Sequence, residues 1–565
     1  MMARGKRISE HSRHGLLRIG LTVIAIGLVG TLAATRPAGA TVLLSCDQAT
    51  IQGVAPDNTT IISATPVTAP VTYCDVRGSI ATSSNGQNNT VLFALGLPND
   101  WRGDFVFIGN GGFAGSIQAV NEGEYVPSIA DGLATAATDT GHESPFGPAL
   151  GSLDGSFGLS GGQPALAARE DFAYRAVHLS TVSSEAITGA YYNSPMYSYF
   201  DGCSTGGRQA LVEAEKFPTD FNGILAGDPA IGNPIAGYNW NDQALLKYSQ
   251  AYLSPADITT IDQAVLAECD GLDGKVDGLI QDPRKCNFNP IKLLCTGGKQ
   301  TGCLNLSQVQ TLQTIYAGAG TNGLAAVLVG RGNASLYPGY MASDPDGPDG
   351  WDEWITGFLE PQFGVADPWG TIPTSLEIAP FQWSFQDQFM KYFVFNNPNY
   401  NSLSFGFTNP ANVAALNASI TQFQANGENA NLAPFFKAGG KLIMYHGWSD
   451  PALTPLVSVD FYTAVAQQID GGSLSKLQNN ARLFMVPGMH HCAGGPGPNV
   501  FDALTPLGEW VQFGIAPTQI IAAHYTDNNQ SLPIDRTMPL CPYPQQAKYT
   551  HGPVDEASSW VCKNP

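Results

Sequence analysis

Ser204 lies in a sequence pattern that supplies nucleophiles for acyl transfer. Residues 202–206 read Gly-Cys-Ser-Thr-Gly and match G-x-S-x-G, in which the serine occupies a sharp turn between a strand and a helix. Residues 197–216 are typical of a strand, a tight turn and a helix with an apolar face. Such a turn lifts the hydroxyl clear of the sheet and points the amide of Thr205 at a developing oxyanion. We therefore predict that Ser204 is a nucleophile; the alternative is a serine in an ordinary glycine turn.

A serine nucleophile needs a general base and an acid that orients the base. In α/β-hydrolases these follow the serine in the order acid, then histidine. Asp450 follows a predicted strand at 441–447, and His491 follows a predicted strand at 482–488. In this arrangement Asp450 would hold the imidazole tautomer and stabilise the imidazolium. An aspartate in a Ser-Asp-Pro sequence is equally consistent with a turn or a cap.

The elements around these residues predict an α/β fold. Residues 103–112 also form an apolar run that ends in a glycine-rich loop, as 441–447 and 482–488 do. Strands that end in polar, glycine-rich loops are typical of a sheet whose chemistry lies at the strand ends. We expect the catalytic domain to comprise residues 41–230 and 431–565.

The segment 231–430 differs from the rest in composition. It is rich in Asp, Gly, Asn, Pro and aromatic residues, contains four cysteines and shows few strand–helix units. We predict that it is an inserted second domain. The alternative is a series of long active-site loops with less core of their own.

The first forty residues are typical of an export signal. Basic residues precede an uncharged apolar run from Ile19 to Ala34, and Ala38-Gly39-Ala40 has the small residues of a cleavage site. A membrane anchor is the alternative, but this run of 16 residues is shorter than the ~20 that a bilayer requires. We predict cleavage after Ala40 and a secreted or periplasmic protein without a stable membrane anchor.

The ten cysteines all follow Ala40, and an even number in an exported protein indicates disulfides. Short spacing favours four local pairs and leaves Cys203 and Cys492 far apart, but spacing does not fix the connectivity. If these two were bridged, the Cα atoms of Ser204 and His491 would lie within about 14 Å, and His490 one residue further from the bridge. The four local pairs are Cys46 with Cys74, Cys269 with Cys286, Cys295 with Cys303, and Cys541 with Cys562.

Composition excludes several classes of protein. With 43% hydrophobic and 13% charged residues, the 565-residue chain is too apolar to be disordered and long enough for more than one domain. Its net charge of -20 makes nucleic acid a poor partner, because an acidic surface repels phosphate. Composition leaves the oligomeric state open.

Several sequence blocks resemble the tannase and feruloyl esterase family of secreted serine esterases. These blocks are FDGCSTGGRQAL, YHGWSDP and PGMHHC, supported by GNGGFAG, ATDTGH, DFAYRAVH, FNGILAGDPA and CPYPQQAKY. They span nearly all of the chain after Ala40. The resemblance implies an α/β-hydrolase fold with a large lid domain inserted after the nucleophile helix.

The resemblance also implies site residues. It assigns the nucleophile, acid and base to Ser204, Asp450 and His491, and it implies a disulfide between Cys203 and Cys492. The oxyanion donors it implies are Gly111 and Gly112, with the amide of Thr205 as partner. One departure is His490, since many relatives have another residue before the catalytic histidine; we interpret it as a neighbour of the base.

Residues 269–280, CDGLDGKVDGLI, form an acidic, glycine-rich segment whose carboxylates suit Ca²⁺. Its spacing is not that of an EF-hand, and composition alone is equally consistent with a solvated acidic turn. The family resemblance implies a structural calcium site in the lid. The implied ligands are Asp270, Asp273 and Asp277, with the backbone carbonyls of Lys275 and Leu279.

The resemblance implies an esterase for aromatic acids, with feruloyl-polysaccharide, galloyl and mono(2-hydroxyethyl) terephthalate esters as the competing substrates. The terephthalate enzyme holds its free carboxylate with a lid arginine, whereas this chain has no arginine between Arg331 and Arg482, and Lys391 would be a weak substitute. A non-catalytic calcium-dependent binder or a peptidase on the same fold are the alternatives. The lid offers aromatic residues for stacking, and we expect more than half to be lid core: Trp351, Trp354, Phe358, Trp369, Phe381, Trp383 and Phe385.

Overall fold

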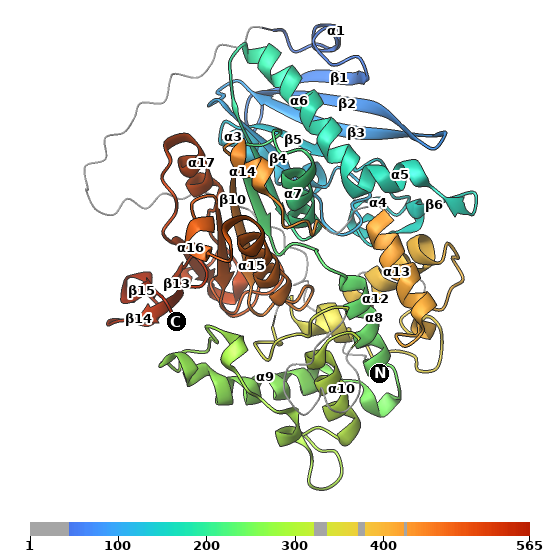
Figure 1. The fold of residues 1–565 in the computed structure, drawn as a ribbon, viewed down its shortest axis with the longest axis vertical. Helices are drawn as coiled ribbons and strands as arrows, with labels where there is room; N and C mark the ends of the chain where they lie inside the picture. The colour runs from blue at the N-terminus through green and yellow to red at the C-terminus, as the bar shows by residue number, and fades with distance from the viewer. Residues whose placement is uncertain (1–43, 321–335, 348, 371–378, 423–426) are drawn as a thin grey trace, which may run out of the picture.

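A nine-stranded sheet forms the centre of the protein (Figure 1). The computed structural model describes residues 44–320, 336–347, 349–370, 379–422 and 427–565, so the expected signal at 1–40 lies outside the described residues. The strand order is β1-β2-β3-β5-β4-β8-β9-β10-β11. The strands are β1 (Thr59–Val67), β2 (Tyr73–Ser84), β3 (Gln87–Pro98), β4 (Asp104–Ile108), β5 (Ala134–Thr138), β8 (Tyr197–Cys203), β9 (Gly223–Gly227), β10 (Lys441–Gly447) and β11 (Ala481–Val486).

The sheet has an antiparallel part and a parallel part. β1, β2, β3 and β5 pair antiparallel in that order, whereas β5, β4, β8, β9, β10 and β11 run parallel. Every residue of β4, β5 and β9 is buried, as expected for parallel strands covered on both faces. The predicted α/β fold is confirmed by this architecture.

Helices cover both faces of the sheet. On one face α6 (Ala176–Tyr192), α7 (Thr205–Lys216) and α15 (Leu456–Asp470) share the largest hydrophobic core, and on the other face α17 (Leu504–Phe513) packs in a separate core. The remaining helices outside the inserted segment are α1 (Gln48–Gln52), α2 (Gln118–Glu122), α3 (Tyr125–Ala130), α4 (Gly147–Gly151), α5 (Leu166–Glu170), α14 (Ala433–Lys437) and α16 (Leu474–Leu477). Short hairpins complete this part: β6 (Leu159–Ser160) with β7 (Gln163–Pro164), β12 (Ile520–Tyr525) with β13 (Ile534–Leu540), and β14 (Gln546–Tyr549) with β15 (Trp560–Lys563).

The lid segment enters between β9 and β10, and its described residues add no strand to the large sheet. It has a hydrophobic core of its own, formed by residues such as Ile258, Leu312 and Trp351. A separate core favours an inserted domain over a series of loops, and we retain the division at 231–430 as a proposal. In Figure 1 the lid lies below the sheet; its helices are α8 (Pro234–Leu245), α9 (Pro255–Cys269), α10 (Leu306–Ala317), α12 (Phe381–Phe389) and α13 (Pro410–Gln422).

Disulfides join all ten cysteines. The pairs are Cys46–Cys74, Cys203–Cys492, Cys269–Cys286, Cys295–Cys303 and Cys541–Cys562. Within the described ranges, none of the helices combines the length and apolar character that a bilayer crossing requires.

Candidate active site

Ser204 occupies a strained turn between β8 and α7. It has φ 62° and ψ -121°, a backbone conformation that residues with a side chain rarely adopt. The glycines around it are required by close packing, because a Cβ on Gly202 would lie 2.7 Å from the Gly206 backbone. A Cβ on Gly207 would lie 2.2 Å from the carbonyl oxygen of Gly227 on β9. The turn therefore presents the Ser204 side chain at the carboxyl end of the parallel strands.

Asp450 and His491 are in direct contact. Nδ1 of His491 lies 2.9 Å from Oδ2 of Asp450, and both side chains are buried. The other oxygen, Oδ1, accepts hydrogen bonds from the backbone N–H groups of Ala452 (2.7 Å) and Leu453 (2.9 Å). Because a carboxylate only accepts, Nδ1 of His491 must donate. In the neutral imidazole this leaves Nε2 unprotonated and able to act as a base.

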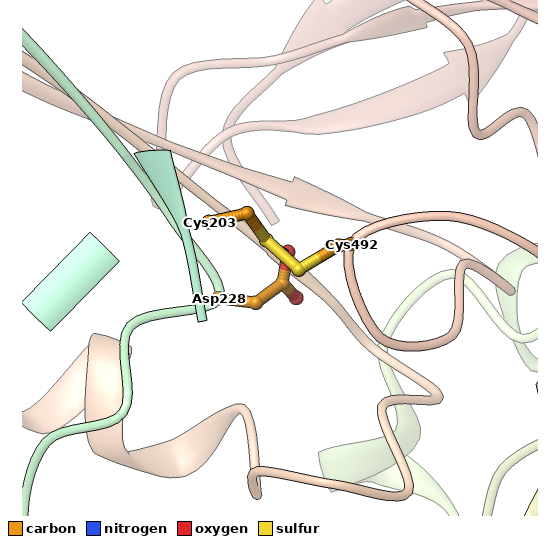
Figure 2. A group of neighbouring side chains, drawn as sticks. All are labelled: Cys203, Asp228 and Cys492. Carbon is orange, nitrogen blue, oxygen red and sulfur yellow. A yellow bond between two sulfur atoms is a disulfide. The ribbon is translucent and has the colours of Figure 1, made fainter. Parts of the chain in front are cut away.

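The Cys203–Cys492 disulfide joins the two residues that flank Ser204 and His491. Figure 2 shows the bridge, whose Cα atoms are 6.0 Å apart although the cysteines are separated by 289 residues. With one ~3.8 Å step on each side, the Cα atoms of Ser204 and His491 lie within about 14 Å. The bridge therefore limits how far the loop of the base can move from the turn of the serine.

Removal of this bridge is expected to lower kcat about a hundredfold, with a smaller increase in KM. The double variant Cys203→Ala/Cys492→Ala frees the loop of His491, and a misplacement of about 1 Å can cost roughly that factor in rate. The chain-entropy model also predicts a loss on the order of 5 kcal/mol in the free energy of unfolding. Steady-state kinetics well below the melting temperature separates the two effects. The control Cys295→Ser/Cys303→Ser, which opens a bridge between residues only 8 positions apart, should retain kcat; equal losses in both variants would contradict a geometric role.

The loop that is expected to bind the oxyanion follows β4. Oγ1 of Thr205 donates to the carbonyl of Gly112 (2.8 Å), which ties this loop to the start of α7. The backbone N–H of Gly111 donates to Oε1 of Gln118 (2.7 Å), so it is not free to donate to an oxyanion. Of the two glycines implied by the sequence, Gly112 is therefore the better candidate donor. Its φ of 52°, together with the 2.4 Å separation between an added Cβ and the Ser152 carbonyl, requires glycine at this position.

Two buried residues that sequence reasoning missed lie behind Asp450. Nε2 of His446 is 3.1 Å from Oδ2 of Asp450, and its Nδ1 is 2.7 Å from Oγ of Ser458. Asp228 follows β9, and its Oδ1 accepts from the backbone N–H of Gly447 (2.8 Å). The signal that could have identified both was their place at strand ends, in the blocks YHGWSDP and FNGILAGDPA.

Asp228 also lies against the disulfide. Its Oδ2 is 3.4 Å from the sulfur of Cys203, and a disulfide sulfur carries no proton to donate. Figure 2 shows the Asp228 side chain beside the bridge. The same bond prevents Cys203 and Cys492 from acting as thiolate ligands, so their proximity to Asp228 does not form a metal site. Burial raises the pKa of Asp228 to about 7, although His446 and His491 oppose the shift.

The electrostatics of the pair favour an ionised Asp450 and a basic His491. Burial disfavours charge on both groups, but the contact with His491 and the hydrogen bond from His446 hold the pKa of Asp450 well below its usual range. Burial likewise lowers the pKa of His491, yet the Asp450 carboxylate outweighs it and raises that pKa above its ordinary value. The imidazole is thus a stronger base than an isolated histidine.

His490 has a different role from its neighbour. It is fully buried, and its Nε2 lies 2.8 Å from the backbone carbonyl oxygen of Asp344 in the lid segment. Since that oxygen can only accept, Nε2 donates to it. His490 therefore connects the loop of His491 to the lid, and of these two adjacent histidines it is His491 that contacts Asp450.

Aromatic side chains of the lid lie beside His491. The Trp354 ring is 4.7 Å from the His491 ring, and Phe381 and Phe385 extend this group at 4.9 and 6.3 Å from Trp354. All three are partly exposed, which suits contact with an aromatic ligand. The expectation that more than half of the lid aromatics are core was wrong: Trp351, Trp369 and Trp383 are buried, whereas Phe358 is 50% exposed.

The acidic segment 269–280 forms a tight loop beside the C-terminal hairpins. Asp270 accepts from the backbone N–H groups of Asp277 and Gly278, both at 3.0 Å, and so shapes the loop. Oδ2 of Asp273 and both carboxylate oxygens of Asp277 are buried without a hydrogen-bond partner in the described structure. Oδ2 of Asp277 also faces Nη1 of Arg536 at 3.9 Å. Buried carboxylate oxygens without hydrogen bonds are donors that fit a hard cation such as Ca²⁺.

Comparison with known proteins identifies the family of this chain. The family model for tannase and feruloyl esterase matches residues 74–563. The chain belongs to the tannase and feruloyl esterase family. The resemblance noted in the sequence is thereby confirmed, and the protein is a carboxylic ester hydrolase.

Individual relatives agree with this assignment. The chain is 31% identical to an uncharacterised esterase of Xanthomonas campestris, over 97% of this chain and 95% of the relative. It is 30% identical to the mono(2-hydroxyethyl) terephthalate hydrolase of Piscinibacter sakaiensis, over 87% and 85% of the two chains. The crystal structure of feruloyl esterase B from Aspergillus oryzae superposes with a TM-score of 0.73 at 26% identity, covering 90% of this chain and 98% of the other.

Proposed function

We propose that this family member is an exported serine esterase that hydrolyses esters of aromatic acids through an acyl-enzyme on Ser204. The observation that carries the proposal is the His491–Asp450 contact at 2.9 Å, joined to the strained Ser204 turn by a disulfide between their neighbours. His491 would take the proton of Ser204 as its oxygen attacks the ester carbonyl. The N–H groups of Thr205 and Gly112 would stabilise the resulting oxyanion.

The second half of the reaction uses the same groups. Collapse of the tetrahedral intermediate breaks the ester bond, and the imidazolium of His491 returns its proton to the leaving alkoxide. A water then attacks the acyl-enzyme while His491 takes its proton, and the carboxylic acid leaves as Ser204 is regenerated. Asp450 stabilises the imidazolium in both steps, which is consistent with its two backbone hydrogen bonds and its direct contact with His491.

The proposed substrate is a small aromatic ester or a polysaccharide that bears aromatic esters. Trp354, Phe381 and Phe385 offer a partly exposed aromatic surface next to His491. A free carboxylate on the ring, as in the terephthalate monoester, would require a cationic partner. Lys391 is held by Asp387 (2.6 Å) and Asp367 (3.2 Å), so it is not available for this purpose. Feruloyl and galloyl esters are therefore favoured.

A panel of esters tests this proposal. We expect kcat/KM of the purified protein to be higher for methyl ferulate or methyl gallate than for mono(2-hydroxyethyl) terephthalate. The neutral methyl esters need only stacking and an oxyanion hole, whereas the monoester also needs charge compensation. Preference for the terephthalate monoester would contradict the substrate assignment, and failure to hydrolyse any of the three would contradict the proposed aromatic specificity.

Export is supported by the disulfides. Five structural disulfides are expected in an oxidising compartment and are rare in a reducing cytosol. They agree with the signal expected at residues 1–40. Mass spectrometry of the secreted protein should place its first residue directly after Ala40.

We also propose that the lid loop binds a structural Ca²⁺ ion, with Asp270, Asp273, Asp277 and the carbonyls of Lys275 and Leu279 as ligands. Asp273→Ala is expected to weaken Ca²⁺ binding and to lower the melting temperature, because an ion that binds only the folded state adds RT ln(1 + [L]/Kd) to its stability. Chelation of the wild type should produce the same shift, and the variant should no longer respond to the chelator. A wild-type melting curve that is unchanged by chelation, with no calcium in the purified protein, would show an acidic turn without an ion.

A further inference from the structure

Three side chains of metal-ligating type meet at the end of the sheet where the parallel strands begin, opposite to the candidate active site. They are His178 on α6, Glu213 on α7 and Asp220 in the turn before β9, and one ligand atom of each lies within 4.8 Å of the others. α6 and α7 pack against one another, as Figure 1 shows. Glu213 lies about two and a half turns beyond Ser204, or about 13 Å along the axis of α7. The cluster is therefore separate from the proposed catalytic groups.

Glu213 is the unusual member of this cluster. It is 1% exposed, and neither carboxylate oxygen has a hydrogen-bond partner among the described residues. Burial raises its pKa well above the ordinary value, and the charges of Asp220 and Glu185 act in the same direction. Protonation would remove the charge but would leave the O–H and the second oxygen without partners, which is costly for a buried group. The two Glu213 oxygens are therefore available to a further ligand at this position.

The other two residues form a fixed pair that reaches the surface. Nδ1 of His178 lies 2.6 Å from Oδ2 of Asp220, and the imidazole stacks on the Phe217 ring at 3.7 Å. Their side chains are 26% and 11% exposed, so a solute ion can reach them. The charged groups that face the cluster are acidic: Glu185 on α6 is itself mostly buried, which raises its pKa to about 7.

In the part of the chain that the structure describes, no lysine or arginine forms an ion pair with this cluster. Among the described residues, His178 makes the one ion pair with Asp220, and neither Glu213 nor Glu185 has an ion pair with a lysine or arginine. Lys216, at the end of α7, lies over the Tyr174 ring instead. A cation is therefore better suited to the cluster than a neutral ligand or an anion.

We propose that His178, Glu213 and Asp220 form a binding site for a divalent transition-metal ion, with Zn²⁺ as the preferred occupant. One imidazole nitrogen and two carboxylates are a donor set for Zn²⁺, whereas Ca²⁺ prefers oxygen ligands in larger number. In a tetrahedral Zn²⁺ site with bonds of about 2.0–2.1 Å, two ligand atoms lie about 3.3 Å apart. Nδ1 of His178 and Oδ2 of Asp220 are now 2.6 Å apart, so these two atoms would have to separate by less than about 1 Å to bind the ion. Glu185 or a water would take the fourth position. The ion would join α6, α7 and the turn before β9 as a structural brace.

Zn²⁺ titration of the full exported protein tests the site. The protein is treated with a chelator, returned to excess Ca²⁺ so that the lid loop cannot contribute, and titrated with ZnCl₂ in a calorimeter. We expect equimolar binding and a rise in the melting temperature. Glu213→Gln should weaken binding by about 100-fold or more, since even the loss of an outer-shell partner often costs about 10–100-fold. When Co²⁺ is added in place of Zn²⁺, the wild type should show the visible absorption of bound Co²⁺, and the Glu213→Gln variant should not.

The variant should fold, because the amide has the same shape and removes an unpaired buried carboxylate. Asp220→Asn, at a ligand more exposed than Glu213, is the second variant and should lose Zn²⁺ binding in the same way. His524→Gln is the matched control, since His524 forms a pair of the same 2.6 Å length with Asp535 but lacks a buried glutamate. It should retain wild-type Zn²⁺ affinity. A wild type that binds no Zn²⁺, or a Glu213→Gln variant that binds it as tightly as the wild type, would overturn the proposal.

Discussion

Replacement of Ser204 by alanine is expected to reduce kcat for methyl ferulate by about a millionfold, to the level that the oxyanion hole and binding alone provide. The reason is chemical: alanine has no oxygen to attack the carbonyl, so no acyl-enzyme can form. The fold should be retained, because alanine has the same Cβ as serine and the strained turn at φ 62° is already occupied by a residue with a side chain. Circular dichroism and thermal melting should match the wild type.

Labelling distinguishes this result from a loss of folding. An organophosphate that reacts with serine esterases should modify the wild type at Ser204 and leave Ser204→Ala unlabelled. The control variant Ser160→Ala changes an exposed hairpin position. It should be labelled at Ser204 and should hydrolyse the substrate at the wild-type rate. Near-normal turnover by Ser204→Ala on any good substrate would contradict the assignment of the nucleophile.

Asp450→Asn is expected to lower kcat by about ten thousandfold, because an amide in place of the carboxylate allows the wrong histidine tautomer. It should also change the pH profile. In the wild type the pKa of His491 is raised above its ordinary value of about 6.5, so kcat/KM should fall as the pH decreases through a value above 6.5. Without the Asp450 charge, this acidic limb should move to lower pH, although Asp228 also raises the pKa of His491 and would retain part of the shift.

The measurement is kcat/KM across the pH range for both proteins, with a substrate that does not itself ionise there. A variant that keeps activity within tenfold of the wild type and the same acidic limb would show that Asp450 does not orient His491. If kcat/KM is lower but the acidic limb of its pH profile is unchanged, the Asp450→Asn substitution acts on packing around Ala452 and Leu453 and not on the charge near His491.

Local sequence predicted the strands that carry the candidate site with good precision. Residues 441–447 are β10, and the predicted strand at 482–488 overlaps β11 at Ala481–Val486. The predicted strand within 103–112 is shorter in the structure, where β4 ends at Ile108 and the glycines that follow lie in the proposed oxyanion loop. Alternating and apolar patterns identify such strands because burial on both faces leaves little freedom in residue type.

The parts that depend on three-dimensional contacts could not be predicted in the same way. His446 lies within the sequence block YHGWSDP. Only the fold shows that it contacts the same oxygen of Asp450 as His491 does. The lid aromatics have no regular spacing, so sequence could not separate the buried Trp383 from Trp354 beside His491. Likewise, the hydrogen bond from the Gly111 amide to Gln118 joins a loop to the first residue of α2, a contact that no sequence pattern encodes.

The position of the Cys203–Cys492 bridge has a consequence for how this protein can diverge. One cysteine precedes the whole inserted lid and the other follows it, so their disulfide links the two chain segments on either side of the lid. Insertions, deletions and substitutions in the lid can therefore accumulate while the neighbours of Ser204 and His491 stay joined. Selection can thus change which ester is accepted without first rebuilding the proposed catalytic groups. Lids exchanged between homologues should be tolerated best when both homologues have this disulfide.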